Sequence, residues 1–347
     1  MIDKVRWGVL GVANIATKKV IPAMQAGEWS TILGIASRDL SKAEAAASQL
    51  GIQKSYGSYQ DLLDDDDIEA VYIPLPNHLH VEWSIKAAQA GKHVLCEKPI
   101  SLSVAEALAL LDVRERTGVN IQEAFMVQTH PQWIAVLSLI RDGRIGSVRS
   151  VMAYFSYNNQ DPKNIRNIRE IGGGGLMDIG CYLIFCSRLI FGAEPRRVVS
   201  LIDEHPATKT DTLTSALLDF EAGQSVFTCS TRITPYQRVQ IIGTEGRIEV
   251  QIPFNAPPDH PCKIFIDNGS DLSGAAIETI EFAVADQYTI QGDLFSQGIR
   301  DQSEPVLSLE DSIRNMAVIE ATFKSMETKS WEAVPQLFTG ESFTTHG

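Results

Sequence analysis

The chain is short of positive charge. Its 347 residues include 30 lysines and arginines against 43 aspartates and glutamates, which gives a formal net charge of −13. Phosphate backbones are bound by basic surfaces, so this balance does not favour a nucleic-acid partner. It remains compatible with a local basic pocket for a small anion.

Long apolar runs and paired cysteines are also missing. No uninterrupted apolar run reaches the roughly 18–20 residues of a membrane helix, and the start shows no secretory leader. The five cysteines include no CxxC pair and no histidine at zinc spacing. They are Cys96, Cys181, Cys186, Cys229 and Cys262. We therefore expect reduced, buried thiols, no metal, no membrane association and a cytoplasmic location.

The length and the pattern of the first third predict two domains, the first of α/β class. A chain of this length is long for one hydrophobic core, and short apolar strands alternate with helical patterns. The strands are expected at 5–11, 31–37, 69–75 and 93–97, and the helices at 14–24, 40–50, 80–90 and 103–117. This alternation predicts a parallel sheet with helices on both faces, in a domain spanning 1–122.

The remainder, 123–347, is expected to form an α+β domain with a large open sheet. Between about 195 and 285, apolar and polar residues alternate between turn signals, which is typical of a mainly antiparallel sheet. The alternation puts polar side chains on the exposed face: Thr212, Thr214, Ser225 and Thr228. An amphipathic helix at 308–328 is expected to pack back on the body of the protein.

The first strand–helix junction reads GVANIA and resembles a dinucleotide-binding turn. Gly11 holds the first glycine position of the fingerprint, Ala13 the second and Ala16 the third. Together with Asn14 and Ile15, these residues would face a pyrophosphate at a helix start. A tight turn without a ligand is the alternative, although its place directly after the first strand favours binding.

The end of the second strand predicts which dinucleotide binds. An acidic residue there would accept hydrogen bonds from a ribose hydroxyl, whereas arginine would pair with a 2′-phosphate. Ser37 and Arg38 occupy this place, so we expect NADP, with NAD possible. The alternative is that Arg38 is solvated and Asp39 turns toward the ribose.

The third strand runs into PLPNHLH, a proline-fixed loop at the edge of the sheet where ligands bind. Pro74, Asn77 and His80 are therefore candidate cofactor-binding residues. A metal at His78 and His80 lacks a suitably spaced carboxylate or cysteine. A bland alternative is that His80 caps the next helix.

The fourth strand ends on Glu97, Lys98 and Pro99, which by the same rule face the crevice. Burial and a nearby pyridinium charge would lower the pKa of a lysine here, so that it could exchange a proton near neutral pH. Proline could hold a tight, even cis, turn that fixes the direction of Lys98. The alternative is a surface pair of Glu97 and Lys98.

A second glycine-rich stretch, GGGGLMDIGCY, precedes an apolar helix expected to start near Leu176. Four glycines suit close backbone approach, and Asp178 and Tyr182 would share a helical face. With Lys98 they would form a proton-transfer triad. Alternatively, Tyr182 belongs to the core and Asp178 caps the helix.

Other polar residues are candidates by position along the chain. Glu123, at the last strand of the first domain, is expected near the nicotinamide amide. Gln128, His130, Asn158 and Arg166 are expected to face substrate.

Three of these stretches together resemble the glucose–fructose oxidoreductase, inositol dehydrogenase and rhizopine catabolism (Gfo/Idh/MocA) family. They are GVLGVANIA, VLCEKPIS and GGGGLMDIGCY, and the similarity covers nearly the whole chain. The nearest branches are dimeric dihydrodiol dehydrogenase and the NADP-dependent sugar dehydrogenases, which share SRD after the second strand and a tyrosine at the end of the third stretch. The resemblance implies a Rossmann domain at the amino terminus.

The resemblance also implies a role for each matching residue. Lys98 would take part in proton transfer at the substrate carbinol, Tyr182 would be the acid/base, and Asp178 would orient substrate and lysine. Glu97 would lie against the nicotinamide ribose. Ala13 departs from the usual second glycine, and its methyl group puts the affinity for the pyrophosphate, but not binding itself, in question.

The implied activity is an NADP-dependent oxidoreductase acting on a secondary alcohol or carbonyl of a sugar, cyclic polyol or dihydrodiol. Two rivals stay open: a relative that uses NAD redox-neutrally to cleave a glycosidic bond, and a non-catalytic nucleotide-sensing regulator. The resemblance further implies a homodimer, or a dimer of dimers, through the open sheet. The exact substrate and the physiological direction do not follow from the sequence.

Overall fold

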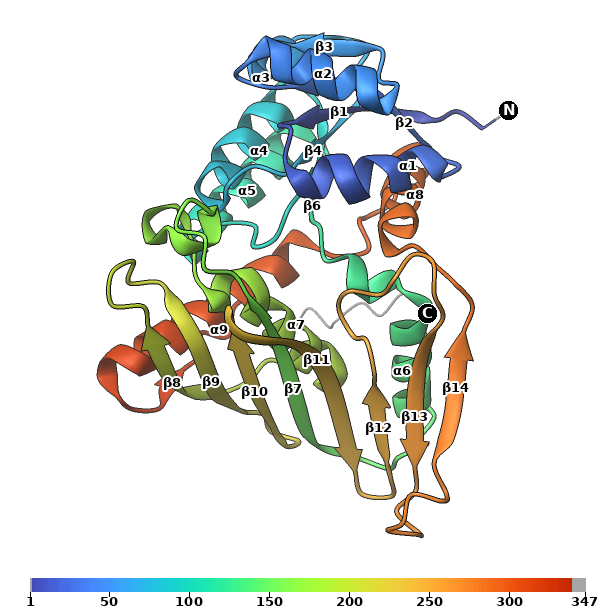
Figure 1. Cartoon of the computed structure of the whole chain (residues 1–347), viewed down its shortest axis with the longest axis vertical. Coiled ribbons are helices and arrows are strands. Elements are labelled where there is room, and N and C mark those ends of the chain that lie inside the picture. The colour runs from blue at the N-terminus through green and yellow to red at the C-terminus, as the bar shows by residue number, and fades with distance from the viewer. Residues whose placement is uncertain (1, 339–347) are drawn as a thin grey trace. The chain divides into compact units, whose positions relative to one another are not determined.

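Residues 2–338 are described by a computed structural model (Figure 1). The chain forms two compact units. Of the described residues, one unit comprises 2–126 and 286–313, and the other comprises 127–285 and 314–338. The boundary predicted after residue 122 lies close to the first crossing. The prediction of a continuous second domain was wrong, however, because 286–313 returns to the first unit.

The first unit is built on a six-stranded parallel sheet in the order β3-β2-β1-β4-β5-β6. Its strands are β1 (Val5–Leu10), β2 (Ser30–Ala36), β3 (Lys54–Tyr56), β4 (Ala70–Ile73), β5 (His93–Cys96) and β6 (Ile121–Glu123). Its helices are α1 (Ile21–Ala26), α2 (Leu40–Leu50), α3 (Tyr59–Leu63), α4 (His80–Gln89), α5 (Val104–Thr117) and α8 (Gln287–Asp301). This strand order is the doubly wound Rossmann order, so the predicted fold class is confirmed.

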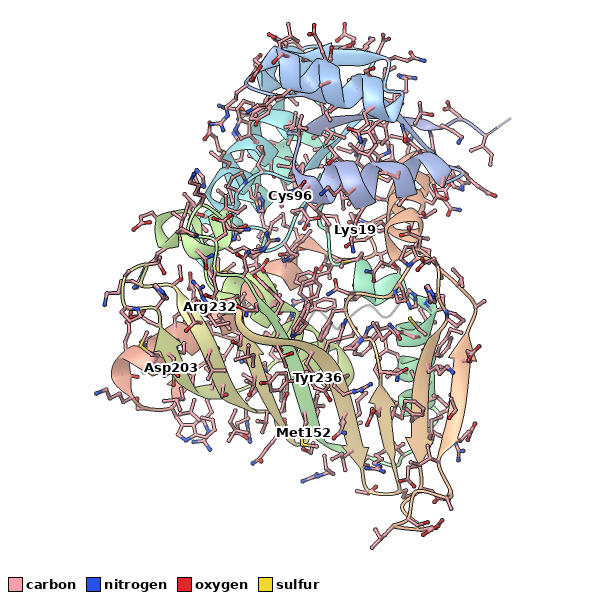
Figure 2. All side chains as sticks on the ribbon, viewed as in Figure 1. Lys19, Cys96, Met152, Asp203, Arg232 and Tyr236 are labelled. Atoms are coloured by element: carbon pink, nitrogen blue, oxygen red, sulfur yellow. The ribbon has the colours of Figure 1, made fainter. Side chains whose placement is uncertain are left out.

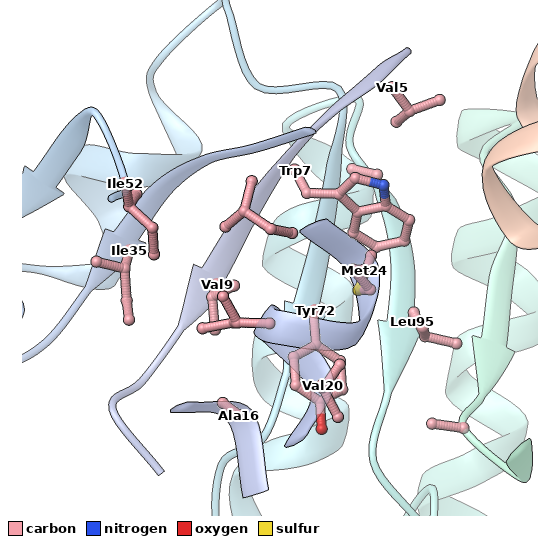
Figure 3. Packing of buried hydrophobic residues seen from close by; sticks show 14 of the residues in the cluster. Val5, Trp7, Val9, Ala16, Val20, Met24, Ile35, Ile52, Tyr72 and Leu95 are labelled. Carbon is pink, nitrogen blue, oxygen red and sulfur yellow. The ribbon is translucent and has the colours of Figure 1, made fainter. Parts of the chain in front are cut away.

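The core of this unit explains why α8 returns to it. Trp7 of β1 is fully buried beside Met24 and Tyr72 (Figure 3). The Trp7 ring centroid lies 5.5 Å from that of Phe295, and Trp7 Nε1 donates to Ser296 Oγ at 3.0 Å. Phe295 and Ser296 both belong to α8. A buried indole N–H needs an acceptor, and α8 supplies it along with apolar cover for β1.

The second unit contains a nine-stranded sheet in the order β14-β13-β12-β11-β7-β10-β9-β8-β15. Its strands are β7 (Val148–Asn158), β8 (Arg197–Glu204), β9 (Asp211–Asp219), β10 (Gln224–Ser230), β11 (Arg232–Gly243), β12 (Arg247–Val250), β13 (Cys262–Asp267), β14 (Glu278–Phe282) and β15 (Glu332–Ala333). Its helices include α6 (Pro131–Arg141) and α7 (Cys181–Phe191). Among the strands of residues 2–338, only β7 and β10 of this sheet pair in parallel, so the sheet is mixed but mainly antiparallel.

Helices cover one face of this sheet. α7 packs on β7 and β10, and α9 (Leu309–Thr328) hydrogen-bonds to β8, where Ser200 Oγ donates to Thr322 O at 2.7 Å. The segment Arg169–Phe191 is long and apolar enough to cross a membrane by composition, yet 89% of its most apolar window is buried within the protein. It therefore has the character of a core helix.

The open face of the sheet is less polar than the sequence predicted. Thr214 and Ser225 are fully buried on the covered face, where the Ser225 hydroxyl lies 2.7 Å from that of Ser187 on α7. Small hydroxyl residues with partners can line a buried face, and so their polarity misled the assignment. Large apolar side chains exposed on the open face are Met152 and Tyr236, labelled in Figure 2, and also Leu201 and Val226.

Candidate active site

The Gly11 turn connects β1 to its helix. Gly11 has a φ of +123°, a conformation that glycine tolerates and other residues rarely adopt, and its N–H donates to Ala36 O at 2.9 Å. The helix starts at once, with Thr17 N–H donating to Ala13 O at 3.0 Å. Ile15, which precedes the π-helical turn Ala16–Val20, makes no side-chain cap. Such a helix start suits an anionic pyrophosphate.

The end of β2 places Arg38 and Asp39 in different environments. Asp39 caps α2, and its Oδ1 accepts from Ser41 N at 3.1 Å and from Ser41 Oγ at 2.7 Å. The hydroxyl hydrogen bond is the main cause that lowers the Asp39 pKa. Arg38 is exposed, and its guanidinium lies against the hydroxyl of Tyr59. Because Asp39 is engaged as a cap, Arg38 is the better placed of the two to meet a ligand.

The loop after β5 carries Glu97 and Lys98, both half-buried, immediately after Cys96 (Figure 2). The Tyr72 hydroxyl donates to Glu97 Oε1 at 2.6 Å. Burial, followed by the Glu97 charge, raises the pKa of Tyr72 well above its usual value. The Lys98–Pro99 peptide bond is cis. Glu97 is thus fixed by a tyrosine from the neighbouring strand.

Two buried side chains hold the backbone of this loop. His80 is fully buried, with Nδ1 2.7 Å from Pro99 O and Nε2 2.7 Å from Leu75 O. Glu123 is also buried, and its Oε1 accepts from Ile100 N–H at 2.7 Å. Together they tie the loop to the ends of β4 and β6.

This geometry gives His80 a structural role. Burial lowers its pKa to about 4, although its two carbonyl contacts favour the charged ring. Both ring nitrogens are engaged by protein backbone, so His80 positions two loops, and its predicted contact with the cofactor stays a prediction. Of the other predicted residues here, Pro74 is buried and Asn77 opens a 3₁₀ turn, Asn77–Leu79.

In the second unit, Asp178 is the centre of a polar cluster. It lies in a π-helical turn, Leu176–Gly180, that leads into α7. Its Oδ2 accepts from Tyr157 Oη at 2.6 Å and from Arg166 Nε at 2.9 Å. Burial, followed by the Asp178 charge, raises the pKa of Tyr157. Tyr182, in the first turn of α7, is 5% exposed and packs against the rings of Phe155 and Phe254.

Asp211 was missed by sequence reasoning. It is 4% exposed at the start of β9, and its Oδ2 accepts from Leu176 N–H at 2.6 Å. A Cβ at Gly174 would overlap Asp211 Oδ1, so the glycine run serves close approach to a carboxylate. A lone aspartate before a strand gave no signal of this contact.

The remaining candidate substrate residues differ in their environment. His130 is buried and caps α6, with Nδ1 accepting from Gln132 N–H at 3.3 Å. This helix cap gives His130 a structural role, and its predicted contact with substrate stays a prediction. Gln128 is half-buried in the 3₁₀ turn Met126–Thr129, and Asn158 is exposed at the end of β7. Of the four, Arg166 is hydrogen-bonded to Asp178.

The candidate residues therefore fall in two separate units. Gly11, Arg38 and the Lys98 loop belong to the first unit, and Arg166, Asp178 and Tyr182 to the second. Within residues 2–338 no group of three or more His, Cys, Asp or Glu side chains could hold a metal ion.

Comparisons with known proteins agree with this arrangement. Residues 5–125 match the model of an oxidoreductase family with an NAD-binding Rossmann fold, and residues 133–249 match the GFO/IDH/MocA C-terminal domain. The chain is 49% identical over 334 residues to an uncharacterized oxidoreductase of Rhizobium meliloti, covering 96% of this chain and 100% of the relative. It is 37% identical to a D-xylose 1-dehydrogenase (NADP(+)) of Haloferax volcanii, covering 93% and 97%.

Among solved structures, the chain resembles a 3-ketoreductase from Actinomadura kijaniata in complex with NADP and TDP-benzene. The TM-score is 0.87 at 30% identity, and the match covers 93% of this chain and 98% of that chain.

Proposed function

The chain belongs to the GFO/IDH/MocA oxidoreductase family, and we propose that it is an NADP-dependent enzyme acting on a sugar, cyclic polyol or dihydrodiol. Hydride would move between the nicotinamide and a secondary alcohol or carbonyl carbon of this substrate.

The observation that carries the proposal is the clamped Lys98 loop. Its backbone is held by His80 and Glu123, and Glu97 is held by Tyr72. Side chains at the carboxyl ends of parallel strands face the ligand crevice of a doubly wound sheet. A lysine in a loop fixed at this edge fits a role at the reacting carbon, where orientation contributes most to rate.

The proposal of NADP rests on the end of β2. Asp39 is engaged as a helix cap, and Arg38 is exposed next to Tyr59, which lies beneath the Gly11 turn. A guanidinium pairs well with a 2′-phosphate. The Haloferax relative is named for NADP and the Actinomadura structure holds it.

A bound nicotinamide accepts or donates the hydride, which is the chemistry that the cofactor supplies. The first unit fits such a group through the Gly11 turn, Arg38 and the Lys98 loop. The chain's own residues would handle the proton: the carbinol proton passes to Tyr182, assisted by the Lys98 ammonium, while Asp178 orients both substrate and lysine.

The Actinomadura enzyme supports this pairing of residues. It has been solved with a lysine replaced and with a tyrosine replaced, and these are separated by the same number of positions as Lys98 and Tyr182. We propose that substrate brings Lys98 and Tyr182 to one carbon.

The test is an absorbance screen of aldoses, polyols and dihydrodiols with NADP, and with NAD in parallel. We expect substrate-dependent NADPH formation that Lys98→Met and Tyr182→Phe reduce by at least about 100-fold. An exposed lysine far along the sequence, Lys324, gives the control variant Lys324→Met, which should keep parental activity. Glycoside cleavage without net NADPH would favour the redox-neutral rival. Binding of NADP without turnover of any substrate would favour the regulatory one.

We also propose that the open face of the nine-stranded sheet joins two copies of the chain. Its exposed apolar residues, Met152, Val226 and Tyr236, lie on adjacent strands and form a patch of the kind that interfaces bury. Val226→Glu should convert a dimer to a monomer in light scattering, and Leu272→Glu, at a fully exposed loop position, should not. A monomeric parent would contradict the proposal of a dimer.

We further propose a cytoplasmic location, which the five buried, free thiols support.

A further inference from the structure

We propose that Asp211 is a positioning residue that fixes the Arg166–Asp178 pair through the backbone of the glycine-rich turn. Its catalytic consequence rests on the function proposed above, whereas its structural consequence does not.

The Asp211 carboxylate is buried and accepts hydrogen bonds from a backbone N–H and a hydroxyl. Oδ2 accepts from Leu176 N–H at 2.6 Å and from Thr214 Oγ1 at 3.1 Å. Burial raises the Asp211 pKa to about 6, against the lowering effect of these hydrogen bonds. A buried carboxylate that keeps donors on it is a rigid anchor, because moving either partner leaves a polar group unpaired.

Gly174 transmits this anchor to the ion pair. It lies against Asp211 Oδ1 so closely that no side chain fits there, at a φ of +125°. Its N–H donates to Arg166 O at 2.9 Å, and its carbonyl accepts from Asp178 N–H at 3.1 Å. The residue pressed against Asp211 therefore bonds to the backbone of both members of the pair.

The side chains of that pair then depend on Asp211. The bond from Arg166 Nε to Asp178 Oδ2 needs both backbones in place. Removing the Asp211 charge would free Gly174 and Leu176 to move, and small displacements of orienting groups reduce turnover strongly. Cys229 of β10 also faces Asp211, and its pKa is raised by burial and then by the Asp211 charge.

The experiment compares Asp211→Asn with Thr214→Val in the full-length protein. Asparagine keeps the volume of the side chain but replaces one acceptor oxygen with a donor and removes the charge. We expect kcat to fall about 10-fold or more, the acid limb of the kcat–pH profile to shift, and the Kd for NADP to stay within about twofold, since binding there uses the first unit. Thr214→Val should change kcat in the same direction by less.

A second measurement is independent of turnover. Amide hydrogen exchange over residues 172–182 should be faster in Asp211→Asn, and the exchange of residues 5–37 should be unchanged. This result would support the anchor even if the parental protein showed no oxidoreductase activity, in which case the proposed function alone would fail.

The inference would be overturned by a folded Asp211→Asn protein with parental kcat, pH profile and exchange. If Asp211→Asn cannot be purified folded, Thr214→Val decides. Parental kcat and parental exchange over 172–182 in that variant would then count against the anchor.

Discussion

The molecule contains two glycine-to-helix junctions that are locally alike and differ in what meets the helix start. Gly11 has a φ of +123° and leads to the π-helical turn Ala16–Val20, while Gly174 has a φ of +125° and precedes the π-helical turn Leu176–Gly180. No side-chain cap is made at Ile15 in the first, whereas Leu176 N–H in the second is taken by Asp211.

This difference teaches that a glycine-rich helix start is a potential anion site whose occupant is decided elsewhere. In the first unit the N–H groups suit an external pyrophosphate. In the second unit the chain supplies its own carboxylate from β9, and so the same backbone device serves to position Asp178 and Tyr182. π-helical turns are frequent at functional sites, and each unit places one beside its candidate residues.

The largest effect should come from Gly174→Ala. The added Cβ would overlap the buried Asp211 carboxylate in a backbone conformation that alanine rarely adopts, so we expect a loss of about 3–5 kcal/mol of unfolding free energy. Urea denaturation measures it. Gly192→Ala is the control, because Gly192 also has a positive φ but a Cβ added there would meet no atom within 4 Å. This variant should lose only about 1 kcal/mol of unfolding free energy. Equal losses would show that the carboxylate contact does not matter.

The next effect is a pH dependence that only the second junction should have. The Asp211 pKa in the folded protein, about 6, lies above the ordinary aspartate value of 3.8. Its contribution to stability is therefore fully present below about pH 4 and is lost as pH rises through about 6. The free energy of unfolding that is lost across this pH range is on the order of 3 kcal/mol. Urea unfolding at pH 4.5 and 7.5 measures the free energy of unfolding of the parent and of Asp211→Asn. Relative to the variant, the parent should be less stable at pH 7.5 than at pH 4.5. A pH-independent difference would contradict the raised pKa.

The third effect tests the ligand of the first junction. Arg38→Ala should weaken the binding of NADP more than the binding of NAD. The difference in binding free energy should be on the order of 1–3 kcal/mol, for a lost charged hydrogen bond. Fluorescence titration with both dinucleotides measures it. Lys42→Ala provides the matched control, since Lys42 is an exposed cation one helical turn away and should alter both affinities little. Equal weakening by Arg38→Ala would overturn the assignment of Arg38 to the 2′-phosphate.

The smallest effect on stability should come from Gly11→Ala. Its Cβ would lie 3.2 Å from Leu75 Cδ2, the end of a flexible side chain, so the strain of the positive φ dominates and we expect about 1–2 kcal/mol. Thermal unfolding measures this, and NADP affinity should fall as well. Gly51→Ala, at a positive φ in open space, should leave NADP affinity unchanged. A loss for Gly11→Ala as large as that for Gly174→Ala would remove the distinction between the junctions.

Much of the fold follows from periodic patterns in the sequence. The alternation of strands and helices predicted the parallel sheet, and the helix 40–50 was predicted at the observed bounds. The patterns missed β3 and α3, which have three and five residues and are too short to show a period. They also missed α8, whose place against Trp7 is a long-range choice.

For the candidate site, the sequence by itself determined the local chemistry: a glycine turn after β1, a cationic residue after β2, and a lysine before proline after β5. These depend on residue type and on neighbours in the chain, and so a linear pattern can carry them. The tertiary structure alone decided that His80 and Glu123 clamp the Lys98 loop and that Asp211 closes the second helix start. The physical reason is that burial and pairing of polar groups depend on which distant backbone reaches them, and no spacing along the chain records that.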